Sequence, residues 1–390
     1  MWYKFGAFLR LLHLKKIGTK FSSFISPKGN IDSSNPEKIL ESVYPDKGSS
    51  SICHNQIDKN PKWDIQVIIP VYNTAKTLEK CIDSVLQQDG RLKILLTIIN
   101  DGSPDEAGDI LERYRIYENI DIIHQENRGY SGARNSGLKE LHAKYVCFLD
   151  SDDSLPTNAL IDLYNKAEET DADIVQGGYN KTDIEGNIRG RHILPDKNQN
   201  GKILGYPWGK IIKSELFENL CFPDHYWFED TLFGLIIFPK ATNISSISSI
   251  VYNYALNPNG ITSKSKGQPK LVDTYWVTKQ LYLDRVNLGI PFNRNDYKFF
   301  LNQVIMNHSR VKTYGSKKLE IALLAAHNQI MQKFFPNIES SDKFYNALIK
   351  SIKELNWNQF SFLRGLYNGN LINLGKLLRL KYKLQSALKH

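Results

Sequence analysis

KYVCFLDSDD, residues 144–153, is the stretch that decides the predicted fold. Its first six residues are mostly apolar, as in a strand that is covered on both faces of a parallel sheet. Three carboxylates follow within four residues, and they repel one another unless a cation is present. The stretch therefore predicts a buried strand whose carboxyl end opens on a charged binding site.

Four further apolar runs have the same character, and helical patterns separate them. The runs are IQVIIP (65–70), ILLTII (94–99), IDIIHQ (120–125) and ADIVQGG (172–178), and the helical patterns lie near 75–88, 104–117, 131–142 and 156–169. This alternation predicts an α/β fold with a doubly wound, mainly parallel sheet. From about 181 to 260 the pattern is irregular, with turns expected at 185–187 and 257–260. Beyond 268 it is helical almost to the end of the chain.

Polar residues follow four of the predicted strands in succession. They are Pro70-Val71-Tyr72-Asn73, Asn100-Asp101-Gly102-Ser103, Glu126-Asn127-Arg128-Gly129 leading to Gly132-Ala133-Arg134-Asn135, and Asp150-Ser151-Asp152-Asp153. Ligands of open α/β sheets bind beyond the carboxyl ends of the strands. We therefore expect these four segments to form one site.

The acidic segment has the chemistry of a divalent-metal site. Mg²⁺ and Mn²⁺ take carboxylate and phosphate oxygens together. A metal held by Asp152, with help from Asp150, would bridge to a diphosphate and neutralise it as it leaves. The alternative is that the aspartates cap the helix expected after Pro156, an explanation that weighs more for Asp153 than for Asp152.

Asp101 and Arg134 are the next candidates. Asp101 follows a strand at a glycine-containing turn, where a carboxylate often bonds its own backbone. Because Asp101 lies among the other strand-end residues, we favour a carboxylate that accepts a hydrogen bond from a nucleobase or ribose. Arg134 opens a helix and is placed to meet the phosphate or base of such a ligand, with a solvated surface arginine as the alternative.

A second acidic pair, Glu229-Asp230, precedes the apolar helical run TLFGLIIF (231–238). Acidic residues near a helix N-terminus are favoured by the helix dipole alone, so capping is one explanation. The other is that Asp230 is a general base, which has to lie within hydrogen-bond reach of an attacking hydroxyl.

Together these motifs resemble those of the family 2 glycosyltransferases with a GT-A fold. The resemblance covers residues 64–260 and is carried by VIIPVYN (67–73), NDGS (100–103), ENRGYSGARNSG (126–137), FLDSDD (148–153) and FEDTLF (228–233). PWGKIIKSELF (207–217) and YNYALNPNGITS (252–263) support it. Arg128 is a departure, because many members of the family have glycine there.

The resemblance implies an inverting, metal-dependent transfer of a hexose from a nucleotide sugar, usually a UDP-sugar, with Mn²⁺ or Mg²⁺. The residues that it assigns to the nucleotide are Pro70, Tyr72, Asp101, Asn127 and Arg134, to which we add the neighbouring Asn73, Asp150 and Ser151. Asp150 and Asp152 correspond to the DxD pair of the family, with Asp152 the direct metal ligand. Asp230 corresponds to the base, and Glu229 to a residue that supports the placement of the acceptor.

The pattern divides the chain into four expected regions. These are a basic amphipathic segment at 1–20, a linker at 21–62, a GT-A domain at 63–265 and a helical region at 266–390. Within the domain we expect residues 63–155 to bind the nucleotide and residues 156–265 to bind the acceptor.

The positive charge of the chain lies at its two ends. The net charge is +9, yet residues 1–20 carry five Lys or Arg and no acid, and residues 341–390 carry nine against two acids. At both ends the basic residues alternate with aromatic residues or leucines, as at Trp2, Phe5 and Phe8 and again at 371–384. This pattern is typical of a helix that lies in an anionic lipid interface. Packing of the C-terminal leucines onto the helical region is the alternative.

No apolar run is long enough to span a bilayer, and the N-terminus lacks a signal-peptide cleavage site. We therefore expect a cytoplasmic protein at the inner face of the cell membrane. Its expected acceptor is a glycan, in the first instance a lipid-linked one of capsule, exopolysaccharide or lipopolysaccharide assembly. A protein-borne or teichoic-acid acceptor stays open.

Other classes of protein fit the sequence less well. A nucleotidyltransferase would need a glycine-rich loop after its first strand, where this chain has VYNTAKTL (71–78). The basic ends lack a nucleic-acid-binding module, so no nucleic-acid partner is expected. A non-catalytic nucleotide-sugar-binding protein would not need both the DSDD segment and the Glu229-Asp230 pair. The four cysteines, at 53, 81, 147 and 221, show no paired short spacing, so we expect reduced thiols.

Overall fold

The computed structural model describes residues 35–183, 185–198, 204–257, 265–292, 296–337 and 339–369. The segment 1–20, most of the turn predicted at 257–260 and the stretch 371–384 lie outside these ranges. The chain divides into two compact units. The sheet unit comprises Asp46–Ser265 and Trp276–Pro291, and the helical unit comprises Met1–Pro45, Lys266–Tyr275 and Phe292–His390.

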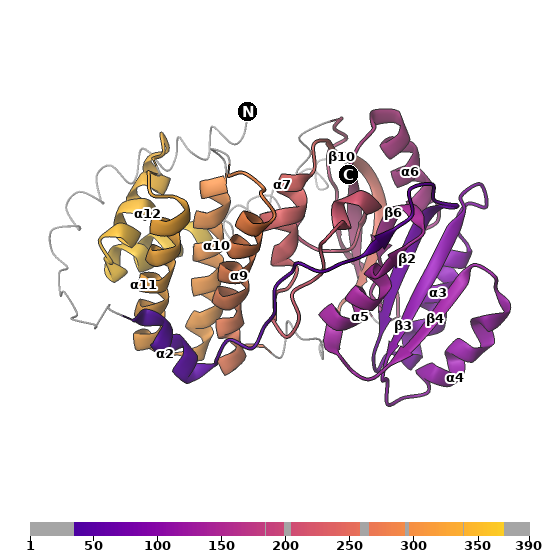
Figure 1. Cartoon of the computed structure of the whole chain (residues 1–390), viewed down its shortest axis with the longest axis horizontal. Helices are drawn as coiled ribbons and strands as arrows, with labels where there is room; N and C mark the ends of the chain where they lie inside the picture. Colours follow the sequence, from indigo (N-terminus) through magenta and orange to yellow (C-terminus); the bar gives the residue numbers. More distant parts are fainter. Residues whose placement is uncertain are drawn as a thin grey trace, which may run out of the picture. The chain divides into compact units, whose positions relative to one another are not determined.

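A mixed sheet with strand order β10-β7-β9-β6-β2-β3-β4 forms the centre of the sheet unit, and β8 pairs with β7 (Figure 1). The strands are β2 (Trp63–Val71), β3 (Ile94–Asp101), β4 (Ile120–Gln125), β6 (Ala143–Phe148), β7 (Ile174–Thr182), β8 (Ile188–His192), β9 (Lys210–Lys213) and β10 (Ile244–Ala255). Strands β4, β3, β2 and β6 are parallel, so their carboxyl ends meet at one edge. Strand β9 runs antiparallel between β6 and β7.

All five predicted strands are present, and the predicted mainly parallel α/β sheet is confirmed. The central strands form where the sequence is continuously apolar, because both of their faces are covered. Every residue of β3 is buried, and β2 is buried from Ile65 onward. The turn predicted at 185–187 joins β7 to β8, with Gly186 at a φ of +91° that favours glycine.

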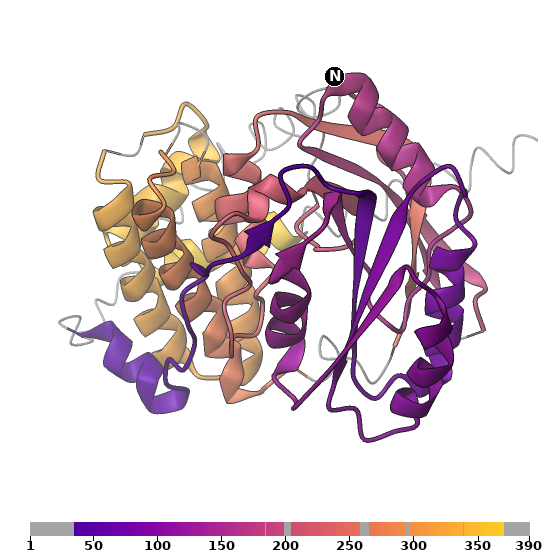
Figure 2. The same ribbon diagram turned by 45° about the vertical axis from the view of Figure 1, so that its right-hand side comes forward.

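Helices cover both faces of this sheet, as Figure 2 shows. Residues of α3 (Ala75–Leu86), α4 (Ala107–Glu112) and α6 (Ala159–Thr170) join the core on one face. On the other face α5 (Gly129–Leu138) packs so closely that a Cβ at Gly137 would lie 2.6 Å from Ile68 Cγ2. Helix α5 ends before the predicted residue 142, because Glu140–Leu141 pair as β5 with β1 (Gln56–Ile57).

Shorter elements complete the sheet unit. They are the 3₁₀ helices η1 (Arg113–Ile116) and η2 (Ser214–Phe217), the π-helix η3 (Phe233–Ile237) and α7 (Phe238–Lys240). The apolar run that follows Glu229-Asp230 is therefore helical, as predicted, with a π-helical part.

The structure describes residues 35–62 of the predicted linker, and they include a helix and hydrogen-bonded segments. Helix α2 (Pro36–Val43) belongs to the helical unit, whereas residues from Asp46 onward belong to the sheet unit. There Ser51 N donates to Asp284 Oδ2 at 2.7 Å, and Asn55 Nδ2 donates to Leu220 O at 2.7 Å. Hydrogen bonds thus hold this segment on the sheet unit.

The helical unit confirms the predicted C-terminal helical region. Its elements are η4 (Pro269–Val272), the start of α9 (Asp273–Asn287), α10 (Asp296–Val311), η5 (Lys312–Tyr314), α11 (Lys317–Phe334), α12 (Lys343–Lys353) and a helix over 357–369. Its core contains a buried ion pair, Arg364 Nη1 to Glu320 Oε2 at 3.0 Å. Asn307 and His327 form a buried hydrogen-bonded pair beside it.

The four cysteines are unpaired thiols, as expected, and Cys81 and Cys147 are buried in α3 and β6. Among the described residues, no helix has both the length and the apolar character that crossing a membrane requires.

Candidate active site

Three of the strand-end loops are bonded to one another at the carboxyl edge of the sheet. Asn73 N, after β2, donates to Ser103 Oγ, after β3, at 2.7 Å. Thr74 Oγ1 donates to Ser151 Oγ, after β6, at 2.8 Å. The expectation that these segments lie together is therefore confirmed for the loops that follow β2, β3 and β6.

Asp101 links the end of β3 to the loop that follows β4. Its Oδ1 accepts from Gln125 Nε2 at 2.7 Å and from Arg128 N at 2.8 Å. The turn is instead closed by Asn100, whose Oδ1 accepts from Ser103 N. The side chain of Asp101 is thus fixed, and its Oδ2 makes no hydrogen bond within the described part of the chain.

Arg134 joins the two acidic motifs. From α5, its Nη2 donates to Asp150 Oδ1 at 2.8 Å and its Nη1 donates to Glu229 Oε1 at 2.7 Å. Burial alone would lower the pKa of Arg134, but the charges of Asp150 and Glu229 raise it above its ordinary value. Arg134 is 4% exposed, so the surface-arginine alternative is wrong. The DSDD segment and the Glu-Asp pair therefore lie close together in the structure.

Asp153 does not cap α6, which begins at Ala159 after an N-cap Asn158 that makes no side-chain cap. Its Oδ2 accepts from Tyr252 Oη at 2.7 Å and its Oδ1 from Ala255 N at 2.7 Å. Burial raises the pKa of Asp153 well above its ordinary value, and the charges of Asp150 and Asp152 add to this. Asp153 therefore ties the acidic segment to β10.

Asp152 fits a metal that is shared with a diphosphate. Its side chain is partly exposed, with one contact at Oδ2 from Asn257 Nδ2 at 3.4 Å. Burial is the main cause of the raised pKa of Asp152, and the negative charge of Asp150 adds to it. A bound cation would favour the charged carboxylate and so lower this pKa. No group of three His, Cys, Asp or Glu in the described ranges is arranged to hold a metal by itself. Mg²⁺ commonly binds one or two carboxylates and completes its shell with phosphate and water.

Unusual backbone surrounds Glu229 and Asp230. Phe228, directly before them, has a φ of +66°, and the π-helix η3 follows at Phe233. Phe233 N donates to Asp230 O at 3.0 Å, so Asp230 lies at the start of the helical run. Strained residues and π-helical turns recur at functional sites.

The remaining predicted residues lie at the same edge. Tyr72 is 46% exposed. Asn127 is exposed and accepts from Gly129 N at 3.2 Å through Oδ1. Pro70 and Ser151 are buried, so they shape the edge rather than offer side chains to a ligand.

Lys210 is a residue beside the site that the sequence alone did not single out. It is 1% exposed, and its Nζ donates to the carbonyl oxygens of Tyr206 and Trp208. Burial lowers the pKa of Lys210 to about 7, while the charges of Cys147 and Asp230 act in the opposite direction. The available signal was a lysine at the start of KIIK, directly before two isoleucines.

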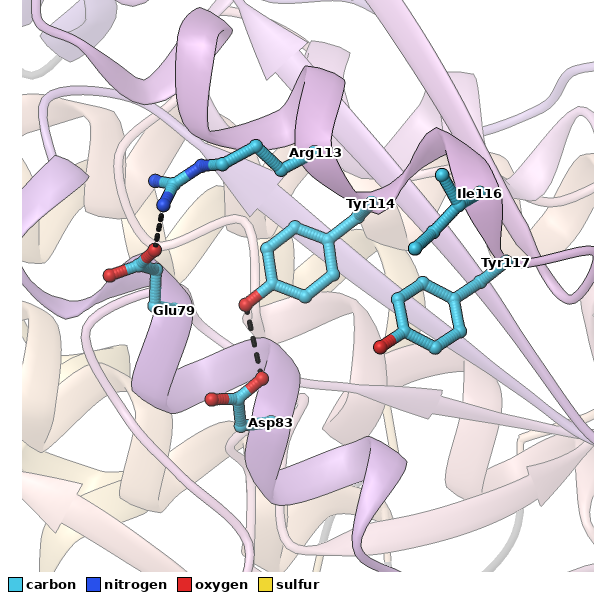
Figure 3. A pocket seen from close by; sticks show the side chains of 6 residues that line it. All are labelled: Glu79, Asp83, Arg113, Tyr114, Ile116 and Tyr117. Atoms are coloured by element: carbon cyan, nitrogen blue, oxygen red, sulfur yellow. Dashed lines mark hydrogen bonds and ion pairs between the residues drawn. The ribbon is translucent and has the colours of Figure 1, made fainter.

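A pocket on the outer surface of the sheet unit, shown in Figure 3, contains none of the predicted site residues. It lies between α3 and η1, where Glu79 pairs with Arg113 at 2.7 Å and Tyr114 Oη donates to Asp83 at 3.0 Å. Tyr117, at its rim, is 41% exposed.

Comparison with known proteins identifies the family. Residues 66–228 match glycosyl transferase family 2. The cholesterol galactosyltransferase of Borreliella burgdorferi is 31% identical over 267 residues, which cover 61% of this chain and 74% of that protein. The chain belongs to the family 2 glycosyltransferases.

Two further similarities show how much of a relative this chain matches and which solved structure has a similar fold. The uncharacterized glycosyltransferase EpsJ of Bacillus subtilis is 33% identical over 216 residues, 51% of this chain and 62% of that protein. The match thus spans less than two thirds of that relative. Residues 1–349 of Staphylococcus aureus TarS, solved with UDP-GlcNAc, have a TM-score of 0.58 at 18% identity, covering 78% of this chain and 92% of that one. The fold is similar to that of TarS.

Proposed function

We propose that the chain transfers a hexose from a UDP-sugar to a hydroxyl group of a glycan, with inversion of configuration and with Mn²⁺ or Mg²⁺. The observation that carries the proposal is the bridge from Arg134 to Asp150 and Glu229. It joins the carboxylates suited to a metal-bound diphosphate to the pair suited to activating an acceptor.

The roles that we propose for the residues are those implied by the family resemblance, and the positions of the residues support them. Asp101 and Asn127 contact the nucleoside, and Tyr72 offers an exposed ring at the same edge. Asp152, with help from Asp150, would hold the metal, which when bound would supply positive charge to the diphosphate leaving group.

Asp230 is the general base. It removes the proton from the acceptor hydroxyl, whose oxygen attacks the anomeric carbon as the bond from that carbon to the diphosphate breaks. UDP leaves from the opposite face. A single displacement inverts the anomeric centre and needs no carboxylate nucleophile, unlike a retaining hydrolase.

The relatives support a UDP-sugar donor and allow an acceptor at a membrane. TarS has been solved with UDP and with UDP-GlcNAc, and the Borreliella relative is named for transfer to cholesterol, a membrane lipid. We propose that the acceptor is a lipid-linked glycan of cell-surface polysaccharide assembly, reached at the inner membrane face. The basic, leucine-rich end of the sequence favours this location.

Release of nucleotide from a donor panel tests the transferase activity. Purified full-length protein with Mn²⁺ is given UDP-glucose, UDP-galactose, UDP-GlcNAc and GDP-mannose, and the nucleotide released is measured. We expect release of UDP from at least one UDP-sugar and none from the Asp152→Asn variant. Release from GDP-mannose alone, or equal release by the variant, would contradict the proposal.

Flotation with vesicles tests the membrane contact separately. Full-length protein should float with vesicles that contain anionic phosphatidylglycerol at low salt, and it should stay in the soluble fraction with neutral phosphatidylcholine vesicles. Recovery in the soluble fraction with both would make a soluble, protein-borne or teichoic-acid acceptor the better explanation.

A further inference from the structure

Four aromatic side chains stack beside the acidic segment. The ring of Trp208 lies parallel to that of Tyr206, with centroids 4.5 Å apart and an interplanar angle of 3°. It also stacks on Tyr252 at 4.4 Å and on Tyr254 at 5.4 Å. We call these four residues the aromatic platform. Two parts of the chain contribute these rings, the loop before β9 and strand β10.

The aromatic platform has a buried base, Tyr252 and Trp208, and an exposed outer ring, Tyr206. Tyr252 is 0%, Trp208 is 7% and Tyr206 is 41% exposed, and Tyr254 is partly exposed. Tyr179, on β7, supports Trp208 edge-on at 5.1 Å. The outer rings are therefore held in place before any ligand arrives, which lowers the entropic cost of binding.

The base of the platform is bonded to the acidic segment. Tyr252 Oη donates to Asp153 Oδ2 at 2.7 Å and accepts from Asp150 N at 3.2 Å. Trp208 forms a parallel bridge with Phe148, at the end of β6, where the acidic segment begins. The position of the platform is thus fixed relative to Asp150.

Lys210 anchors the other side of the platform next to the proposed base. Its Nζ donates to Tyr206 O and to Trp208 O, and it lies 5.6 Å from the centroid of the Phe233 ring, at the helical run that Asp230 opens. Lys210 forms no ion pair among the described residues. Its side-chain nitrogen instead holds the backbone of the loop that carries Tyr206, the outer ring of the platform.

Strand order separates the platform from the proposed nucleoside contacts. Asp101 ends β3 and Asn127 follows β4, on one side of β6, whereas β9, β7 and β10 lie on the other side. A nucleoside on β3 and β4 and a diphosphate at Asp152 leave the platform side for the second substrate.

We propose that the exposed rings of Tyr206 and Tyr254 bind a pyranose ring of the acceptor glycan, and so hold its hydroxyl near Asp230. The C–H face of a pyranose is apolar and weakly positive, and it complements the weakly negative face of an aromatic ring. Binding sites of this kind combine aromatic rings with a few polar groups that fix orientation. The inference rests on the proposed function, because it needs a sugar acceptor.

Saturation-transfer NMR on the full-length protein tests this inference. The probes are the methyl β-glycosides of glucose, galactose and N-acetylglucosamine, each added with saturating UDP and Mn²⁺ so that the donor site is filled. The variants are Tyr206→Ala, Tyr206→Phe and, as a matched control, Tyr117→Ala, since Tyr117 has the same exposed fraction of 41% but lies in the pocket of Figure 3. UDP affinity is measured for each variant by calorimetry.

We expect saturation transfer from aromatic protons of the wild type to the C–H protons of at least one glycoside. Tyr206→Ala should weaken that signal by on the order of tenfold, since one stacked ring is lost, and Tyr206→Phe and Tyr117→Ala should keep it. UDP affinity should be unchanged in all three. A wild type that binds UDP but no glycoside, or a Tyr206→Ala variant that loses UDP binding instead, would overturn the inference. A wild type that does not bind UDP would overturn the proposed function itself.

Discussion

Arg134 donates to Glu229 across 95 residues of sequence, with 2.7 Å between Nη1 and Oε1. The second terminal nitrogen of the same guanidinium holds Asp150, and the arginine side chain is 5% exposed. A planar guanidinium can hold two carboxylates at fixed angles, which an ammonium cannot do. The proposed donor and acceptor halves of the site therefore share one buried cation.

Replacing Arg134 by lysine should reduce transfer by on the order of a hundredfold, because one ammonium cannot hold both carboxylates in place. Arg134→Ala should in addition lower the free energy of unfolding by roughly 3–5 kcal/mol, since two carboxylates lose their partner. Steady-state kinetics and urea unfolding measure the two effects. Arg128→Lys is the matched control, since the side chain of Arg128 is 54% exposed. Wild-type turnover by Arg134→Lys would refute the bridging role.

Asp152→Asn should abolish transfer while the thermal unfolding temperature stays within a few degrees of the wild type. The carboxylate is proposed to act on a metal, and its one contact among the described residues is long. Excess EDTA should have the same effect on the wild type, and added Mn²⁺ should reverse it. Full activity in EDTA would remove the metal from the mechanism.

Replacement of Asp153, the next residue, should lower the stability of the fold, unlike replacement of Asp152. Asp153→Ala leaves Tyr252 Oη and Ala255 N without their acceptor, which should cost roughly 1–3 kcal/mol of unfolding free energy. Urea unfolding of Asp152→Ala and Asp153→Ala side by side gives the comparison. Equal stability of the two variants would contradict the structural role of Asp153.

The strand-end motifs could be predicted because each follows an uninterrupted apolar run, and parallel strands bring their carboxyl ends to one edge. The partners of Arg134 and Asp153 could not, because Glu229 and Tyr252 lie far along the chain and no local pattern encodes their contact. The sequence pattern of 181–260 is irregular for a physical reason: β8 is largely exposed and β9 is only four residues long. The platform left one signal, the alternate spacing of Tyr206 with Trp208 and of Tyr252 with Tyr254, but only coordinates bring the two pairs together.

The stability of the helical unit should fall in mild acid because of His327. This side chain is 0% exposed, with Nδ1 next to Leu323 O at 2.8 Å and Nε2 next to Asn307 Nδ2 at 3.1 Å. Burial lowers the pKa of His327 to about 4, and His308 beside it is lowered too. Between pH 6.5 and 4, His327 therefore binds a proton in the unfolded chain but stays neutral in the folded chain. The free energy of unfolding consequently decreases as the pH falls.

For His327 alone the loss should reach about 2 kcal/mol by pH 5, given the ordinary pKa near 6.5. Urea unfolding at pH 7.5 and pH 5 measures it, and His327→Gln should show a smaller difference between the two pH values. His142→Gln, a variant of a histidine whose side chain is 40% exposed, should show the wild-type difference. An identical difference in all three proteins would rule out His327 as the titrating group.

The most direct test of a single site with a donor half and an acceptor half is the Asp230→Asn variant, measured for both UDP binding and turnover. An amide cannot take the proton of the acceptor hydroxyl, but it leaves the size of the side chain and the bridge from Arg134 to Glu229 in place. Calorimetry with Mn²⁺ should therefore give a UDP affinity within about twofold of the wild type, while transfer falls by on the order of 10²–10⁴. Loss of UDP binding would place Asp230 in the donor site or the fold, and transfer at the wild-type rate would show that it is not the base.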